Sequence, residues 1–338
     1  MFKRFLAAAV GVLLVAGCQQ QTSTAVDANY FDGKTITYIV ATDPGGGYDT
    51  YGRLIARYMQ KHLPGSRVVV RNVPGAGHIV GANTINAARP DGLTIGMFNT
   101  GLIYNQLLKL DGVQFDLAKM SWIGKASNEL RVMLVATNSP YKSFEEMLHA
   151  GVPIKFAASG VGSAAYLDAR ILDSIFPELE VQVIAGFDGS EGELSMLRGE
   201  VVAQVGIASS YENFVHAGNG YYALAMSQLA ADDLPGVPLA QDYVTTEDGH
   251  RLLSLLEALS DLGRLTVGPP GIPPDILAIL REAHNAAVAD PDLLAEAKTM
   301  LIPITGGTGE YVQGRIAEAL NQPPETIAAL AVAAAPPQ

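Results

Sequence analysis

The sequence predicts an α/β protein of two lobes, because strand-like and helix-like segments alternate along almost the whole chain. The run Thr35 to Ala41 is rich in β-branched residues, and Thr50 to Leu63 carries apolar residues at the spacing of one helix face. The segments Arg67 to Arg71, Gly77 to Ala88 and Leu93 to Phe98 continue the order strand, helix, strand. This order predicts a mainly parallel sheet covered by helices.

A second series of alternating elements begins at Arg131 and predicts the second lobe. Ser143 with Glu146, and Ser190 with Glu193, have the spacing of capping boxes that start helices. The expected strands are 131–137, 155–158, 181–185, 204–208 and 221–226, and the expected helices are 143–149, 164–176 and 190–198.

The C-terminal part of the chain is predicted to be mostly helical. The segment Leu265 to Gly268 leads into a proline-rich turn, and helices are expected from Asp275, after the Asp290-Pro291 pair and over 310–320. By analogy with two-lobed receptors, we expect these helices to return to the first lobe. The Ala/Pro-rich tail, 328–338, is expected to fray. The predicted lobes are 33–130 plus 264–338 for the first, and 131–263 for the second.

The N-terminal residues predict export and attachment to a membrane. Lys3 and Arg4 precede the apolar run Phe5 to Ala16, which is shorter than the roughly 20 residues of a spanning helix. The run leads to Cys18, the only cysteine of the chain, as in a bacterial lipoprotein signal. We expect residues 1–17 to be a signal peptide, Cys18 to be lipidated and residues 18–32 to form a tether. An ordinary signal peptide or a short anchor helix is the alternative.

Composition and missing motifs exclude several functions. The net charge of −12 argues against nucleic-acid binding, so any anion site has to be local. One cysteine permits no internal disulfide, and the six histidines are scattered. The chain has no Gly-x-Ser-x-Gly, His-Glu-x-x-His or P-loop motif. We therefore expect no enzymatic activity, no cofactor and no metal.

The glycine-rich turn between the first strand and the first helix is the strongest candidate binding site. Three consecutive glycines remove every side chain, so backbone N–H groups at the positive end of a helix dipole can bind a carboxylate or phosphate. Asp49 or Thr50 would cap the helix. The alternative is a tight turn that needs only a positive φ angle. The candidate residues are Pro44, Gly45, Gly46, Gly47, Tyr48 and Asp49.

A second glycine turn follows a strand of the second lobe, and its bare backbone N–H groups predict an anion site in the same way. A ligand gripped between the two turns would be bound by both lobes. Weaker candidates at the edge of the cleft are Thr100 with Gly101, and Phe187 with Asp188 before a helix; the alternative for Phe187 is a place over the core. The residues of the second turn are Ser159, Gly160, Val161, Gly162 and Ser163.

The segment Pro74 to Gly81 has glycine spacing close to a dinucleotide-binding fingerprint. A nucleotide-dependent oxidoreductase is therefore an alternative function. Against it, no clear ribose-binding acidic residue follows the next strand. Close packing of a helix on a sheet explains the glycines, and we expect His78 to be a loop side chain.

Several segments, in collinear order, resemble the extracytoplasmic solute receptors of the tripartite tricarboxylate transporter family. The resemblance implies a Venus flytrap fold, with two α/β lobes joined by two crossover segments. It also implies a carboxylate held through backbone amides and water between the first turn, Gly45 to Asp49, and the second, Ser159 to Ser163. The matching segments are DPGGGYDTYGRLIARYM, RNVPGAGHIVGANTI, RPDGLTIG, SGVGS, FDGSEGELSMLRGEV, YALAMS with LPGVPLAQD, and GPPGIPPDILAILREA.

The chain departs from the family pattern at two places. Where the family usually has Pro-Tyr-Lys-Gly, this chain has Gly186-Phe187-Asp188-Gly189, and Val202 replaces an acidic residue. These differences predict a more apolar cleft. The resemblance further implies a monomer on the periplasmic side of a bacterial membrane that delivers an organic carboxylate to permease subunits. A ligand-sensing subunit of a signalling partner is the alternative.

Overall fold

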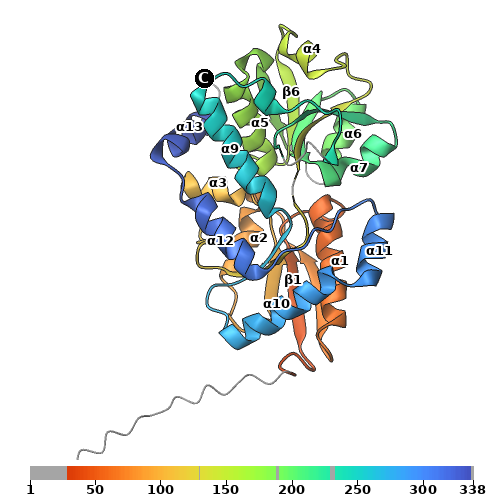
Figure 1. Cartoon of the computed structure of the whole chain (residues 1–338), viewed down its shortest axis with the longest axis vertical. Coiled ribbons are helices and arrows are strands. Elements are labelled where there is room, and N and C mark those ends of the chain that lie inside the picture. The colour runs from red at the N-terminus through yellow and green to blue at the C-terminus, as the bar shows by residue number, and fades with distance from the viewer. Residues whose placement is uncertain (1–28, 129, 188–189, 229–232, 336–338) are drawn as a thin grey trace, which may run out of the picture.

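The computed structural model describes residues 29–128, 130–187, 190–228 and 233–335. They form two α/β lobes, one above the other (Figure 1). The predicted signal peptide, Cys18, most of the tether and Asp188 lie outside the described residues. Within the described ranges, no helix has both the length and the apolar character that crossing a membrane would require.

The first lobe is built on a mixed sheet of five strands. Strand β1 is parallel to β2 and β3, as predicted. The prediction of parallel strands does not extend to β10, which is antiparallel to both β3 and β4 because the chain leaves this lobe through β4 and returns through β10. The order across the sheet is β2 (Arg67–Asn72), β1 (Thr35–Val40), β3 (Thr94–Met97), β10 (Leu265–Gly268) and β4 (Ser121–Lys125).

Helices cover both faces of this sheet and bury an apolar core. Helix α1 (Gly47–Lys61) turns Tyr51, Leu54 and Ile55 inward at helical spacing, and α10 (Pro274–Val288) packs beside it. Asp290 accepts a hydrogen bond from the N–H of Asp292, so the predicted helix start there is confirmed. The remaining helices of this part are α2 (Ile79–Asn86), α3 (Leu102–Leu107), α11 (Pro291–Thr299) and α12 (Gly309–Leu320).

The second lobe repeats the plan with another mixed sheet of five strands. Strand β6 is parallel to β7 and β8, whereas β5 is antiparallel to β8 and β9. The order is β7 (Val181–Ala185), β6 (Ile154–Ala158), β8 (Ala203–Ile207), β5 (Arg131–Ala136) and β9 (Gly220–Ala225). Its helices are α4 (Phe144–Leu148), α5 (Ala164–Ile175), α6 (Glu191–Leu197), α7 (Ala208–His216) and α9 (Glu247–Leu262).

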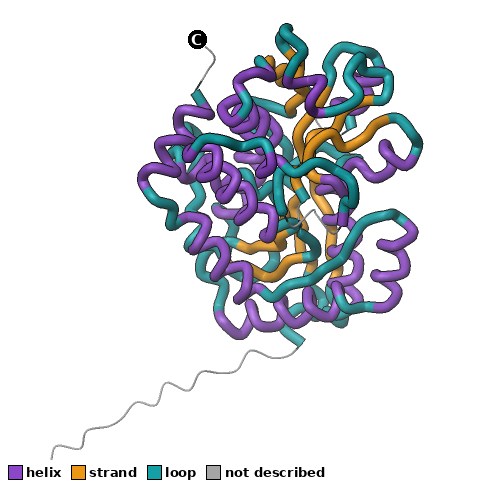
Figure 2. Tube along the Cα trace, turned by 45° about the horizontal axis from the view of Figure 1, so that its top comes forward, coloured by secondary structure: helices purple, strands orange, loops and turns teal. Residues whose placement is uncertain are grey.

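Two local predictions were wrong. Ser190 precedes α6 but makes no side-chain cap, whereas Ser143 caps α4 by accepting from the N–H of Glu146. The tail does not fray before Ala334: it forms α13 (Pro324–Ala334), which buries Leu330 against α5 and α9 of the second lobe. Figure 2 shows this terminal helix and its neighbours as adjacent purple tubes. Alanine-rich sequence is therefore helical where a neighbouring surface covers it.

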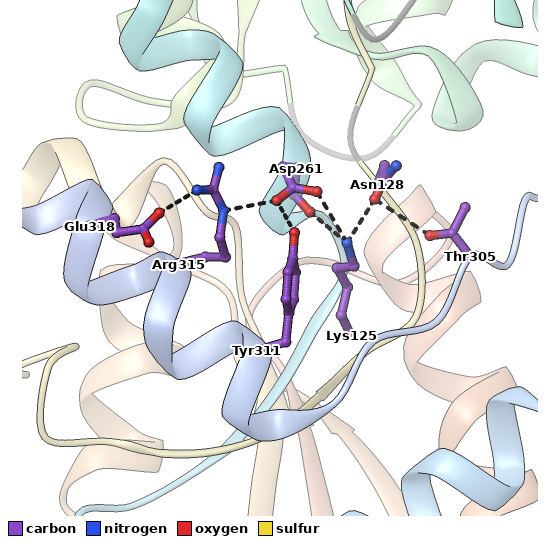
Figure 3. Close-up of polar contacts among 7 residues, drawn as sticks. All are labelled: Lys125, Asn128, Asp261, Thr305, Tyr311, Arg315 and Glu318. Carbon is purple, nitrogen blue, oxygen red and sulfur yellow. Dashed lines mark hydrogen bonds and ion pairs between the residues drawn. The ribbon is translucent and has the colours of Figure 1, made fainter.

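A polar network holds the two connections between the lobes, which run from β4 to β5 and from α9 to β10 (Figure 3). The buried Lys125 Nζ donates to the Asp261 carbonyl oxygen and to Asn128 Oδ1, both at 2.8 Å. Arg315 Nε on α12 donates to Asp261 Oδ2 at 2.9 Å, and the Tyr311 hydroxyl contacts the same carboxylate. The network therefore fixes both connections to the first lobe.

We expect His284 on α10 to make the fold sensitive to acid. It is fully buried, and neither ring nitrogen has a hydrogen-bond partner among the described residues. Burial lowers its pKa from 6.5 to about 4, so the unfolded chain takes up a proton before the folded one. The stability contributed by the neutral ring is complete above pH 6.5 and falls by about 3 kcal/mol as the pH drops to 4.

The measurement is urea unfolding of the chain and of His284→Leu at pH 7 and pH 4. The variant should lose about 3 kcal/mol less stability between these pH values than the original chain. Equal losses in the two proteins would contradict the assignment.

Candidate ligand-binding cleft

A cavity of about 590 Å³ lies between the two lobes. The first lobe lines it with the start of α1, His78, Asn99 and Ile302, and the second lobe with residues of β5, α5, α6, β8 and α7. A larger depression of about 910 Å³ lies on the outside of the first lobe, between α1 and β2. We place the site in the interlobe cavity, because only there can movement of the lobes enclose a ligand.

The first glycine turn lines this cavity through Gly45, Gly46, Gly47 and Tyr48. Gly45 has φ +96°, and Gly46 is the N-cap of α1 with no side chain to satisfy the first N–H groups of the helix. The turn therefore presents backbone and the positive helix end to the cavity. Pro44 is exposed and does not line the cavity.

Asp49 holds the turn from behind. Its carboxylate accepts hydrogen bonds from the Gly45 N–H at 3.0 Å, from Arg53 Nε at 2.9 Å and from Asn72 Nδ2 at 2.9 Å. Burial alone would raise the pKa of Asp49, but these hydrogen bonds outweigh it and lower the pKa. Asp49 does not line the cavity, so its carboxylate does not oppose an anion there.

A buried arginine lies behind the same turn. Arg264, in the connection from α9 to β10, is fully buried; its guanidinium carbon lies 3.9 Å from the ring centroid of Tyr48. Its Nη2 donates to Ser210 Oγ of α7 at 2.7 Å, while Nε and Nη1 have no hydrogen-bond partner among the described residues. A Cβ atom on Gly47 would lie 2.9 Å from this Nη2 and would overlap Ser210. Gly47 therefore lets α1, the connection and the second lobe meet.

Sequence reasoning missed Arg264. The available signal was one arginine in a short apolar stretch, Leu262-Gly263-Arg264-Leu265, because a buried charge has to be compensated. Its charge favours an anion in the cavity beside the turn.

His78 was expected to be a loop side chain, but it is buried and lines the cavity. Its ring lies edge-on to Tyr48, with centroids 5.7 Å apart. Burial, and then the charge of Arg264, lower the pKa of His78 to about 4, so the ring is neutral at pH 7. The turn carries His78 inward because Ala76 and His78 both adopt positive φ angles, +46° and +80°.

The second glycine turn packs against the turn at Gly77, whereas we expected it to line the cavity opposite the first glycine turn. Its five residues, Ser159 to Ser163, do not line the cavity, and Val161 points to solvent. A Cβ atom on Gly77 would lie 2.6 Å from the backbone nitrogen of Ser163. The second turn thus closes against the turn at Gly77, and the residues that follow it, Ala164 and Ala165 of α5, reach the cavity.

The lobes also meet at Thr100 and Gly101, which likewise do not line the cavity. Arg131 Nη2 donates to Thr100 Oγ1 at 3.0 Å, and Arg131 forms a buried ion pair with Asp168. A Cβ atom on Gly101 would lie 2.9 Å from the Cα atom of Ala164. These residues therefore join the lobes beside the site.

The sequence predicted a more apolar cleft from its departures from the family pattern at 186–189 and 202, but none of these positions is among the described lining residues. Phe187 packs against the core of the second lobe, Val202 against the larger core, and Asp188 lies outside the described residues. The second lobe instead lines the cavity with Arg131, Asp168 and Glu193, and burial raises the pKa of Glu193. None of the three was singled out from the sequence as a site residue, and the cleft is more polar than predicted.

The glycines of the Pro74 to Gly81 segment serve packing. A Cβ atom on Gly81 would lie 2.8 Å from the carbonyl oxygen of Val73 and 2.8 Å from the Cα of Ala41. Close approach of α2 to the sheet therefore accounts for this glycine. Among the described residues, no three His, Cys, Asp or Glu side chains are grouped as a metal site would need.

Two α/β lobes, two connections and a cavity between them define the class of two-lobe periplasmic solute-binding proteins. The chain belongs to the tripartite tricarboxylate transporter family receptors, whose family model matches residues 52–316. This is a family of periplasmic solute receptors and not of enzymes, which sets aside the oxidoreductase alternative.

Individual relatives are distant but cover nearly the whole chain. The UPF0065 protein in the tcbD-tcbE intergenic region of Pseudomonas sp. (strain P51) is 25% identical over 309 residues, 89% of this chain and 87% of the relative. The structure of MatC from Rhodopseudomonas palustris with bound malate has a TM-score of 0.68 and 20% identity, covering 85% of this chain and 98% of that one. The R. palustris protein Rpa4515 with adipate has a TM-score of 0.70 and 18% identity, covering 88% and 97%.

The contact at Gly77 predicts that Gly77→Ala separates the lobes. The new methyl group meets the backbone of Ser163, which has no flexible end that can turn away. Small-angle X-ray scattering should show a larger radius of gyration, and ligand binding should weaken.

The matched control is Gly33→Ala, at the far end of β1. Gly33 has φ +68°, close to the +60° of Gly77, but no atom lies within 4 Å of its Cβ position. Both variants should lose about 1–2 kcal/mol to left-handed backbone strain, and only Gly77→Ala should expand. Equal radii would show that Gly77 does not set the approach of the lobes.

Proposed function

We propose that this chain is a lipid-anchored receptor that binds an organic carboxylate in the interlobe cavity and delivers it to the permease subunits of a tripartite transporter. The observation that carries this proposal is the glycine turn at the start of α1, which lines the cavity with Arg264 buried behind it. Bare N–H groups, a helix dipole and a guanidinium all favour negative charge at the same place.

Physical chemistry supports a carboxylate as the group bound there. A hydrogen bond from a backbone N–H to a charged oxygen contributes about 1.5–3 kcal/mol once water is excluded. Gly45 and Gly46 line the cavity without side chains, so the oxygens can approach the backbone there, and Ser209 and Ser210 line the cavity from the second lobe. Because the ligand contacts both lobes only in the closed form, binding favours closure.

The structural neighbours agree with this ligand class, since the ligands of MatC and Rpa4515, malate and adipate, are carboxylates. We assign the ligand's first carboxylate to Gly45–Tyr48. The residues of the second turn and Thr100 with Gly101 act in closure in this proposal. A monomer remains our proposal. Lobes of 33–130 plus 264–338 and of 131–263 also remain our proposal, except that α13 (Pro324–Ala334) packs on the second lobe and not on the first.

Calorimetry against a panel of mono-, di- and tricarboxylates tests the function directly. The expected result is micromolar or tighter binding of at least one acid. Binding of a neutral sugar with no binding of any acid would overturn the proposal.

Gly46→Val should abolish binding without unfolding the protein. Gly46 has φ −87° and ψ 176°, a backbone conformation that valine adopts readily, so the change acts on the approach of the ligand. Loss of two charge-assisted hydrogen bonds should weaken affinity by roughly 100-fold or more.

Calorimetry with the acid identified above and thermal unfolding measure the two effects. Gly314→Val is the control, because Gly314 lies on the outer side of α12 with no atom within 4 Å of its Cβ position. Normal affinity in Gly46→Val would show that the turn is not the site.

The lipid anchor has its own test. Cys18→Ser should release the receptor into the soluble periplasmic fraction, because the variant cannot be lipidated. Fractionation with palmitate labelling of both proteins measures this. Membrane association and label retained in the variant would exclude Cys18 as the anchor.

A further inference from the structure

Glu193 places a carboxyl group at the second-lobe side of the cavity. It lies in the first turn of α6 and lines the cavity together with Leu194 and Ser190. The Gln204 side chain of β8 hydrogen-bonds to this carboxyl group, and Gly192 leaves room for Gln204, whose amide would overlap any Cβ atom there. The carboxyl group is therefore held in position from behind.

One oxygen of this carboxyl group has no protein partner. Glu193 Oε2 is buried and makes no hydrogen bond to any described residue. The other charged side chains of the described lining, Arg131 and Asp168, form an ion pair with each other. Within the described lining, no cationic side chain is left to pair with Glu193, and a buried carboxylate oxygen without compensation is costly.

We infer that Glu193 Oε2 accepts a hydrogen bond from an ammonium group of the ligand, which makes the ligand an amino-carboxylate. The inference rests on the proposed function, because it takes the first glycine turn as the place of the ligand's carboxylate. The first lobe then supplies donors for the negative end, and the second lobe supplies an acceptor for the positive end.

The same oxygen discriminates against dicarboxylates. A second carboxylate at this position would face a like charge, or would require Glu193 to bind a proton first. An alkyl end would leave the buried oxygen unpaired, and sites built around a polar partner reject such analogues strongly. The expected preference therefore differs from the malate and adipate found in the structural neighbours.

Calorimetry with sets of matched probes tests this inference. One set is 5-aminopentanoate, its methyl-ended isostere hexanoate, and adipate; a shorter set is 4-aminobutanoate, pentanoate and glutarate; an α-amino set is L-norvaline with pentanoate. In at least one set, the amino acid should bind at least tenfold more tightly than every other member.

Glu193→Gln should remove this preference. The affinity for the amino acid should fall at least tenfold, while the affinity for the methyl-ended acid should stay within about threefold of the original. The control is Glu191→Gln, which makes the same change of charge on an exposed residue of α6 outside the lining and should preserve the preference. Thermal unfolding confirms that both variants fold, and the selectivity of the original chain tests the inference without any variant.

A dicarboxylate or methyl-ended acid that binds as tightly as the amino acid in every set overturns the inference, as does a preference that survives in Glu193→Gln. In these cases carboxylates still bind and the proposed function stands. Failure of every acid, including the mono- and dicarboxylates, instead overturns the proposed function and this inference with it.

Discussion

The contact between the lobes at the glycine turn depends on the fully buried guanidinium of Arg264. It lies over Tyr48 of the glycine turn and donates to Ser210 of the second lobe, while its backbone belongs to the connection between the lobes. A charge removed from water needs aromatic faces, hydroxyl groups or anions around it, and a desolvated cation–π contact contributes about 2 kcal/mol. One side chain thus joins the connection, the glycine turn and the opposite lobe, and its charge adds to the effect of burial in lowering the pKa of the neighbouring His78.

Two kinds of contact have different roles at the cleft. Contacts between bare backbones, at Gly77 with Ser163 and at Gly101 with Ala164, set how closely the lobes approach. Polar side chains, among them Glu193 in the lining and Arg264 behind the glycine turn, give the cavity its charged surroundings. The network at Lys125 and Asp261 holds both connections on the first lobe, and one apolar core continues from the first lobe into the second.

The sequence predicted the fold better than the site. Periodicity located most strands and helices, since apolar spacing in α1 and the β-branched run in β1 are local properties. It missed α13 and the antiparallel β10, because both depend on packing between segments far apart in the chain. The sequence drew attention to the first glycine turn, which lines the cavity, because its glycines are consecutive residues. Arg131 and Glu193 come from separate elements, and only the fold brings them to one cavity, with Arg264 behind the turn that lines it.

The glycines themselves show why a motif alone does not define a role. Gly45 bares the backbone toward open space at the cavity, and Gly47 makes room for Ser210 and Arg264. Gly77 and Gly101 bare the backbone toward the opposite lobe, and Gly81 brings a helix onto a sheet. In sequence these positions look alike, since each is a glycine between a strand and a helix or just inside the helix. What distinguishes them is the neighbour that a Cβ atom would meet: open cavity, the opposite lobe or the protein's own sheet. All these positions therefore use the same property, a backbone without a side chain. Tertiary packing decides whether that backbone faces a cavity, the opposite lobe or the sheet of its own lobe.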